Sequence, residues 1–348
     1  MGGFRITFFF SAAPAIAAFL GGLSSSPLAA QTSNACEAGS ALFRSKDYGA
    51  AQGELWKCVL AGAPSRDSGW LLAQTYRELK NYDDGFARLG RSRHGNASAV
   101  DLLYIEGFLQ FRAGKHRESI DILGRGFQID PKDWRIHQVF ALNYVVLEIA
   151  EGALQELQVA IQLNPRNAEL HYQLARFFYS QNRVTESVEA SEKALALEPD
   201  YADVYTNLGL CHESLGEESK ALLNYEKAVE ITRRLQRPDE WPFLNHASFL
   251  IKRGETERSL ALLADGLARN PHSGRAYYLR GKALRKLERL AEAKRDLERS
   301  IALDPKDPTP YYELGFLLRT LGDSAGSKRM FENFQTLSKR PPARQPSP

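Results

Sequence analysis

The sequence predicts an all-α solenoid, a superhelical stack of antiparallel helix pairs, and three observations lead to this prediction. The first is a set of nine small residues that recur every 34 residues, with a single interval of 38. Its members are Gly39, Ala73, Gly107, Ala141, Ala175, Gly209, Ala247, Gly281 and Gly315. The second is a pair of further small-residue sets that follow the first set at offsets of 12 and 19 residues. The third is the absence of any convincing strand pattern. A fixed period of this length is typical of a repeat array whose units pack on their neighbours.

The small residues have a packing reason. Each repeat divides into two helical stretches, A and B, and a large side chain between two close helices would cost about 1–3 kcal/mol. We expect the first two sets to lie where helices A and B of one repeat approach most closely. We expect the third set, which runs from Cys58 to Ser300, to contact the next helix A. Phe334 occupies that register in the ninth repeat, after which no further helix follows.

This pattern resembles the tetratricopeptide repeat family, whose repeats place small residues at positions 8, 20 and 27 and proline at position 32. Five repeats have that proline, namely Pro131, Pro165, Pro199, Pro271 and Pro305. Ala63, Ala97 and Arg233 depart from the pattern at this position. The resemblance covers residues 33–338 and implies nine stacked helix pairs with a concave groove. The family's shared residues are packing residues, so the resemblance implies a fold more specifically than it implies a function.

The repeats fall into two blocks, repeats one to six over residues 33–237 and repeats seven to nine over residues 238–338. Four extra residues lie between Ala228 and Ala247. We expect them to lengthen the second helix of repeat six by about one turn, before Pro238 ends it and a loop continues through Pro242. Residues 339–348 contain four prolines and no apolar run, which predicts a disordered tail.

Helix ends are also marked in the sequence. Asp133, Asn167 and Asp200 follow the position-32 prolines, where the next helix needs an N-cap. Gly114 and Gly216 are predicted to end the A helices of repeats three and six.

Residues 1–30 have the pattern of a secretory signal peptide. Arg5 precedes an uncharged, mostly apolar run from Ile6 to Leu23, and small residues lead to a cleavage site near Ala30 and Gln31. The alternative is an uncleaved N-terminal helix that anchors the protein, because the run is close to membrane-spanning length. We therefore expect an exported protein, periplasmic or secreted, without a membrane span once the signal peptide is removed.

Three cysteines are present. Cys36 begins helix A of repeat one and Cys58 ends helix B, and an antiparallel pair brings these two ends together. In an oxidising compartment we expect a Cys36–Cys58 disulfide, which would stabilise the first repeat by about 3 kcal/mol. The alternative is two buried free thiols. Cys211 lies well inside a helix and is predicted to be an inert core thiol.

No pattern of a catalytic, cofactor or metal site stands out. There is no glycine-rich phosphate loop after a strand, no paired-histidine metal motif and no Cys-x-x-Cys pair. His137 and His171 occupy the same position in successive repeats, and we favour packing roles over a metal site for them. Because the repeats fill residues 33–338, we predict that the chain is not an enzyme and has no cofactor.

A partner-binding groove is implied by the resemblance, in which positions 2, 5, 9, 12 and 13 of helix A face the partner. Carried onto this chain, the candidates are Tyr104, Phe108, Arg112, Arg135, Gln138, Tyr172, Arg176, Tyr179, Arg275, Tyr278, Lys282, Arg285, Lys286, Tyr312 and Arg319. Basic and aromatic residues alternate among them, most densely in repeats eight and nine. They suit an extended, negatively charged peptide. The alternative is that Lys282, Arg285 and Lys286 form an ordinary solvated face.

The sequence therefore predicts a non-catalytic protein–protein interaction module that binds a peptide or protein in a concave groove, in the cell envelope or secreted. The alternative is a structural component of a cell-envelope complex that uses convex or terminal surfaces. A net charge of +3 is too small to indicate nucleic acid as the partner.

Overall fold

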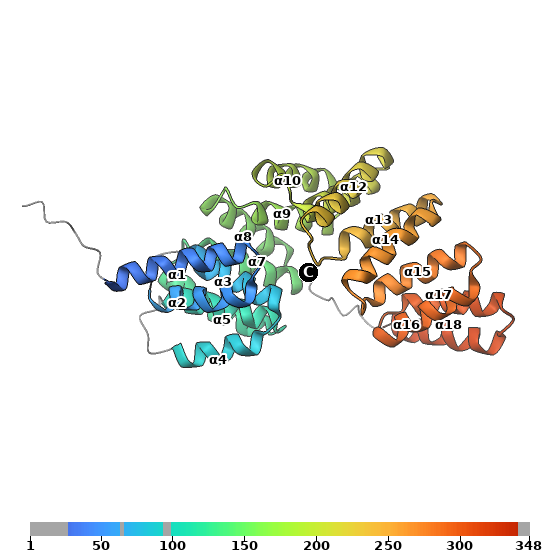
Figure 1. Cartoon of the computed structure of the whole chain (residues 1–348), viewed down its shortest axis with the longest axis horizontal. Helices are drawn as coiled ribbons and strands as arrows, with labels where there is room; N and C mark the ends of the chain where they lie inside the picture. Colours follow the sequence, from blue (N-terminus) through green and yellow to red (C-terminus); the bar gives the residue numbers. More distant parts are fainter. Residues whose placement is uncertain (1–26, 63–65, 93–98, 340–348) are drawn as a thin grey trace, which may run out of the picture. The chain divides into compact units, whose positions relative to one another are not determined.

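The structure is a computed structural model that describes residues 27–62, 66–92 and 99–339 (Figure 1). These residues form eighteen α-helices and no strand, which confirms the predicted all-α repeat architecture. The chain divides into two compact units, residues 1–105 and residues 106–348, with the boundary inside helix α5. The predicted division of the array near residue 238 stays a prediction. The predicted proline-rich tail lies outside the described residues, apart from Lys339.

The first unit contains α1 (Pro27–Arg44), α2 (Tyr48–Leu60), α3 (Arg66–Leu79), α4 (Tyr82–Ser92) and the start of α5 (Ala99–Arg112). The second unit contains the rest of α5, α6 (His116–Ile129), α7 (Trp134–Val146), α8 (Ala150–Leu163), α9 (Ala168–Ser180), α10 (Val184–Leu197), α11 (Ala202–Ser214), α12 (Glu218–Arg234), α13 (Trp241–Arg253), α14 (Thr256–Arg269), α15 (Gly274–Lys286), α16 (Leu290–Leu303), α17 (Thr309–Thr320) and α18 (Ser324–Ser338). Odd-numbered helices are the A helices and even-numbered helices are the B helices of the repeats.

The second unit has an inner and an outer helix layer. Each A helix packs against its own B helix, and successive A helices also contact each other in the pairs α9–α11, α11–α13, α13–α15 and α15–α17. Among the described residues, no two successive B helices pack to a comparable extent. The A helices are therefore the inner layer of this unit and the B helices the outer layer, as in a curved array of stacked hairpins.

The first two sets of small residues lie where helices A and B of one repeat meet, as predicted. A Cβ atom added to Gly209 would lie 2.6 Å from Cδ1 of Tyr225, which is on the B helix of the same repeat. The second set adds hydrogen bonds at this contact, because the Ser187 hydroxyl donates to the carbonyl oxygen of Ala175 at 2.7 Å. Glycine at position 209 is thus a steric requirement, and Ser187 lies close enough to helix A to hydrogen-bond to its backbone.

The third set contacts the next helix A as predicted where Cys58 Sγ lies 3.1 Å from the Ser68 hydroxyl and Ala194 packs in one cluster with Val204, and two of its members also contact helix A of their own repeat. A Cβ added to Gly266 would lie 3.0 Å from Cδ2 of Leu244, and the Ser300 hydroxyl donates to the carbonyl oxygen of Gly274 at 2.8 Å. Both contacts are with the helix A of the same repeat. In an antiparallel hairpin the end of helix B lies beside the start of helix A. Gly266 and Ser300 therefore have to be small because helix A of their own repeat packs against them.

The predicted lengthening of the second helix in repeat six is confirmed. Helix α12 has 17 residues, whereas α10 and α14 have 14. It ends differently as well, because Gln236 adopts a left-handed conformation with φ 49° and the N–H of Arg237 donates to the carbonyl oxygen of Thr232 at 3.0 Å. The A helices α7, α9, α11, α13 and α15 are followed by such a left-handed residue, whereas the C-caps of α6, α8, α10, α14 and α16 have φ between −139° and −134°.

The predicted loop through Pro242 is too long. Helix α13 begins at Trp241, and Pro242 lies in its first turn. Proline fits there because the first helical residues need no donor to an earlier carbonyl.

Two of the three predicted N-caps are confirmed. Asp133 accepts from the N–H of Arg135 and Asn167 from the N–H of Glu169, each at 3.0 Å. The prediction for Asp200 is wrong, because Tyr201 is the N-cap of α11 and the Asp200 carboxylate pairs instead with Arg234 at 2.6 Å. Asp200 directly follows its proline, one residue before the register that Asp133 and Asn167 occupy.

The described cysteines fall into two environments. Cys36 on α1 and Cys58 on α2 are joined by a disulfide, with their Cα atoms 5.0 Å apart. Cys211 is a buried free thiol that donates to the Ser187 hydroxyl at 3.2 Å, and burial raises its pKa. A buried protonated thiol is a poor nucleophile, which fits a packing role.

The predicted signal peptide lies mainly in residues 1–26, outside the described part. Its last residues form the start of α1, so the predicted cleavage site near Ala30 stays a prediction. Within the described ranges, no helix has both the length and the apolar run that crossing a bilayer requires.

Candidate functional site

The candidate interface is the C-terminal inner face, which we define as the predicted residues of α15 and α17. It consists of Arg275, Tyr278, Lys282, Arg285, Lys286, Tyr312 and Arg319. Both helices belong to the inner layer and contact each other. Arg275, Lys286, Tyr312 and Arg319 are exposed, Lys282 and Arg285 are half-buried, and Tyr278 is buried. The structure therefore brings four of the seven side chains to the surface of two adjacent helices.

Three cations of this face have partners within the protein. Arg285 pairs with the carboxylate of Glu313 at 2.9 Å, and Lys282 lies 3.9 Å from the same carboxylate. Lys286 donates from Nζ to the carbonyl oxygen of Ile251 at 2.8 Å, near the end of α13. One buried carboxylate thus serves two cations, which leaves an excess of positive charge beside it.

The remaining two cations lie over aromatic rings. The guanidinium of Arg275 is 5.2 Å from the ring centroid of Tyr278, and that of Arg319 is 4.7 Å from the ring of Phe316. Tyr312 meets Phe316 edge-on at 4.7 Å. Stacking of this kind holds each guanidinium flat while its N–H groups stay available at the surface.

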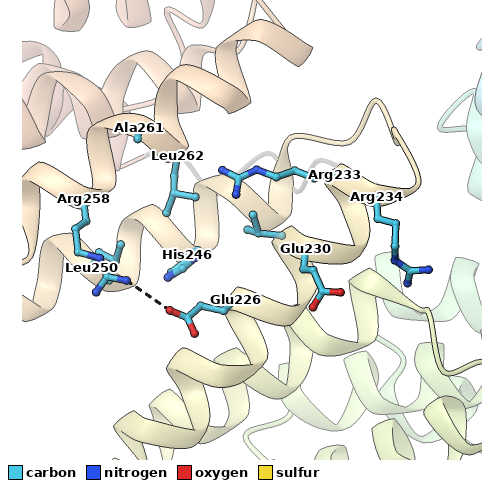
Figure 2. A pocket seen from close by; sticks show the side chains of 10 residues that line it. Glu226, Glu230, Arg233, Arg234, His246, Leu250, Arg258, Ala261 and Leu262 are labelled. Carbon is cyan, nitrogen blue, oxygen red and sulfur yellow. Dashed lines mark hydrogen bonds and ion pairs between the residues drawn. The ribbon is translucent and has the colours of Figure 1, made fainter.

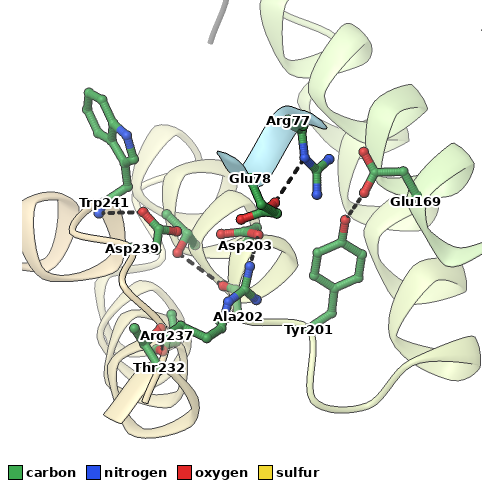
Figure 3. A network of polar contacts seen from close by, with 12 residues as sticks. Arg77, Glu78, Glu169, Tyr201, Ala202, Asp203, Thr232, Arg237, Asp239 and Trp241 are labelled. Atoms are coloured by element: carbon green, nitrogen blue, oxygen red, sulfur yellow. Dashed lines mark hydrogen bonds and ion pairs between the residues drawn. The ribbon is translucent and has the colours of Figure 1, made fainter. Parts of the chain in front are cut away.

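A second group of predicted residues lies on α9. Tyr172, Arg176 and Tyr179 are half-buried, and the guanidinium of Arg176 is 5.6 Å from the Tyr172 ring. The Tyr172 ring packs 5.1 Å from that of Tyr201, whose hydroxyl donates to Glu169 (Figure 3). These contacts fix the aromatic side chains in place.

A polar network holds the loop that follows α12 (Figure 3). Arg237 pairs with Asp203 of α11 at 3.0 Å, and the Asp239 carboxylate accepts from the N–H of Trp241 at 3.1 Å. Burial and the negative charge of Asp203 raise the pKa of Asp239. The longer connection is therefore fixed on both sides of Pro238.

The predicted residues nearest the N-terminus are less accessible. Tyr104, Phe108, Arg135 and Gln138 are all buried, and the Arg135 guanidinium donates from Nε to the Asp133 carboxylate at 2.9 Å. Arg112 is half-buried. A partner would not reach the four buried side chains while they are covered in this way.

The two histidines in matching positions pack as expected for structural residues. Nε2 of His137 lies 3.0 Å from the carbonyl oxygen of Pro131, and Nε2 of His171 lies 3.0 Å from that of Pro165. Nδ1 of His137 also lies 2.5 Å from Glu156. Each histidine ties its helix to the preceding turn. Within the described residues, no three His, Cys, Asp or Glu side chains form a group that could hold a metal ion.

Sequence reasoning missed a pocket of about 670 Å³ that is lined by residues of α12, α13 and α14 (Figure 2). Its lining includes His246, which precedes Ala247 of the first small-residue set. Leu174, Leu208 and Leu314 occupy that register in other repeats. A histidine where several repeats have leucine was the available signal.

Comparison with known proteins agrees with the repeat pattern. A family model described as "TPR repeat" matches residues 175–216, and two models described as "Tetratricopeptide repeat" match residues 202–234 and 244–332. The chain is 24% identical over 261 residues to the BBSome complex member BBS4 of Bos taurus, a match that covers 66% of this chain and 50% of that protein. The chain spans half or less of the length of the first curated relatives that it matches.

Solved structures show the same fold. The Cut9–Hcn1 hetero-tetramer of the APC/C contains a chain that is similar with a TM-score of 0.65 and 13% identity, over 78% of this chain and 52% of that chain. The pilF protein of Pseudomonas aeruginosa is similar with a TM-score of 0.53 and 20% identity, over 64% of this chain and 97% of that chain. The matching models show that residues 175–234 and 244–332 consist of tetratricopeptide repeats, in agreement with the small-residue sets and the paired helices.

Proposed function

We propose that the chain is a non-catalytic interaction module that binds a peptide or protein segment along the inner layer, with the C-terminal inner face as the main contact. The tetratricopeptide repeat fold supports a protein–protein interaction scaffold. The observation that carries the proposal is the exposure of Arg275, Lys286, Tyr312 and Arg319 on two adjacent inner helices. The aromatic ring of Tyr312 can cover an apolar side chain of the partner, and the cations on the same face can pair with a negative charge of the partner.

The partner segment is proposed to be acidic. Arg275 and Arg319 pair with no carboxylate among the described residues, and both are held over aromatic rings. Glu313 is shared between Lys282 and Arg285, so the positive charge there exceeds the negative. A guanidinium held in this way can bind a carboxylate through two parallel hydrogen bonds.

The proposed place of action is the cell envelope or the exterior, after export by the predicted signal peptide. Fractionation of the cells that make the protein, with N-terminal sequencing, tests this proposal. A periplasmic or secreted chain that begins near Gln31 is the expected result. An intact chain in the membrane fraction would favour the anchored alternative, and an intact cytosolic chain would contradict export.

The binding proposal is tested by photo-crosslinking in the same cells. A photoreactive phenylalanine analogue at Tyr312 is expected to capture one polypeptide reproducibly, whereas the same analogue at Arg299, which is exposed on the B helix α16 of repeat eight, is not. If both positions capture the same proteins equally, the inner face has no special role.

Charge reversal then tests the acidic character of the captured segment. The double variant R275E/R319E is expected to bind it at least about tenfold more weakly, since two charge-assisted contacts are lost. R299E is the matched control, because it reverses a charge on the outer layer. Unchanged affinity in R275E/R319E would contradict the acidic partner.

A second candidate is a structural component of a cell-envelope complex, which would use outer or terminal surfaces. The matched Bos taurus relative is named as a member of the BBSome complex, and this similarity is what favours the candidate. Crosslinks that map to B helices, at fixed stoichiometry, would support it over the inner-face proposal.

A further inference from the structure

The outer layer has a pocket where the array departs from its 34-residue spacing. Helices α12 and α14 form its walls and α13 contributes to its floor (Figure 2). Arg233 and Arg234, which line it, belong to the extra turn of α12. The four-residue insertion therefore builds part of the wall, and the pocket is separate from the C-terminal inner face.

His246 is the unusual residue of this pocket. It is only 4% exposed, and neither ring nitrogen has a hydrogen-bond partner among the described residues. One face of the imidazole is stacked on the Tyr225 ring, with the centroids 6.1 Å apart. A buried polar group without a partner destabilises the fold by about 1–3 kcal/mol, so a ligand that supplied a hydrogen-bond partner for His246 would recover that free energy.

The imidazole is neutral at physiological pH. Burial, with the nearby charges of Arg258 and Arg233, lowers the pKa of His246 to about 4. A neutral imidazole has one N–H donor and one nitrogen acceptor. A hydroxyl group can use either nitrogen, because it also donates and accepts.

The pocket walls narrow the class of ligand. Val229, Leu250 and Leu262 supply apolar surface. The arginines at the rim already have acidic partners, since Arg233 pairs with Asp265 and Arg234 with Asp200, both at 2.6 Å. Arg258 pairs with Glu255 and lies 3.5 Å from Glu226. The rim thus offers no spare positive charge for a carboxylate, while its guanidiniums can still flank a ring.

We propose that this pocket receives a tyrosine side chain of a partner polypeptide, with its hydroxyl group bonded to His246. Tyrosine combines an apolar ring with one donor and one acceptor, and it is enriched at the centres of protein interfaces. A volume of about 670 Å³ also leaves room for the residues that flank the ring.

The test uses the full chain and two blocked tripeptides, acetyl-Ala-Tyr-Ala-amide and acetyl-Ala-Phe-Ala-amide, which differ by the hydroxyl group alone. The tyrosine peptide is expected to shift the NMR signals of the His246 imidazole in a saturable way and to bind about tenfold more tightly than the phenylalanine peptide. Equal binding of the two peptides, or shifts confined to other histidines, would overturn the proposal. Tighter binding of acetyl-Ala-Glu-Ala-amide would also overturn it, in favour of an acidic ligand.

Two variants separate binding from folding. H246L places the residue type of other repeats in this register and is expected to remove the preference for the hydroxyl group while the helical circular dichroism is kept. Ala261 is exposed at the pocket, so A261W is expected to abolish the His246 shift by filling the pocket without disturbing the core. If A261W folds and still shows the full shift, the peptide binds elsewhere and the proposal fails. Neither variant lies on α15 or α17, which carry the C-terminal inner face, so the outcome leaves the proposed function independently testable.

Discussion

Helices α10 and α12 occupy equivalent places in successive repeats and differ in how they end. The C-cap of α10 is extended, and the chain enters the next helix A after four residues. Helix α12 continues for another turn and ends with the left-handed residue Gln236. In both repeats the first small residue nevertheless lies against the helix B of its own hairpin, since Gly209 fits against Tyr225 and the carbonyl oxygen of Ala175 accepts from the Ser187 hydroxyl. The comparison teaches that hairpin packing and the connection between hairpins are set by different residues.

The largest expected effect is a change in the free energy of unfolding with pH, which His246 causes at the irregular junction between α12 and α13. His246 has a pKa near 4 in the folded protein, against 6.5 for an ordinary histidine, so the folded state binds a proton less readily than the unfolded state. Stability should therefore fall as the pH drops from about 6.5 to 4, by about 3 kcal/mol in total from this group. Arg233 and Arg258 strengthen the effect, and Glu255 opposes it.

The measurement is the free energy of unfolding of the parent and of H246L at pH 7 and pH 4. Other groups titrate in both proteins, so the difference between the two isolates His246. H246L should lose less stability on acidification than the parent. The same loss in both proteins would show that the imidazole is not held neutral.

A smaller effect tests the hairpin packing that both regions share. In Gly209→Ala the added methyl group would meet the Tyr225 ring at 2.6 Å, so a loss of about 1–3 kcal/mol is expected although alanine favours helices. Gly124→Ala on α6 is the matched control, because no atom lies within 4 Å of its new Cβ, and it should gain about 0.5–1 kcal/mol. Thermal unfolding of the two variants checks the prediction, which a destabilised Gly124→Ala would contradict.

The smallest effect compares the N-cap of a regular repeat with its counterpart at the junction. Asn167→Ala removes a side-chain cap and should cost about 1 kcal/mol. Asp200→Ala removes only an exposed pair with Arg234 and should cost less, because solvent screens such pairs. The shift of the thermal midpoint, measured at low and high salt, separates them. Only the Asp200 effect should weaken with salt, and an equal, salt-independent loss would show that Asp200 caps a helix after all.

Much of the fold could be predicted because closely packed helices exclude large side chains at single positions. The sequence shows each such position directly, as a small residue. A glycine at position 209 is required by the ring that lies against it, and that requirement repeats with the hairpin. The longer α12 was also predictable, since Pro238 limits where the added turn can end. Asp200 was misassigned because capping depends on a register of one residue, and a proline marks the turn without fixing that register.

The candidate site was less predictable. Family positions indicate which way a side chain points but not whether a neighbour covers it, and Arg135 is buried with Asp133 where an exposed cation was expected. Sequence also gives no measure of the space between two helices. The pocket beside His246 depends on that space, so only the histidine itself, in a register that holds leucine in four other repeats, pointed to it.

The extra length of α12 also limits which insertions an array of this kind tolerates. Helix α12 is three residues longer than α10 and α14, and a helix turns by about 100° per residue, so the added segment amounts to about 300°, a little less than one revolution. The core-facing stripe of the helix then continues almost in line. Two added residues would have rotated it by about 200° and presented the same apolar stripe to water. An addition of nearly one revolution therefore keeps the core-facing stripe of α12 buried while it brings Arg233 and Arg234 to the pocket.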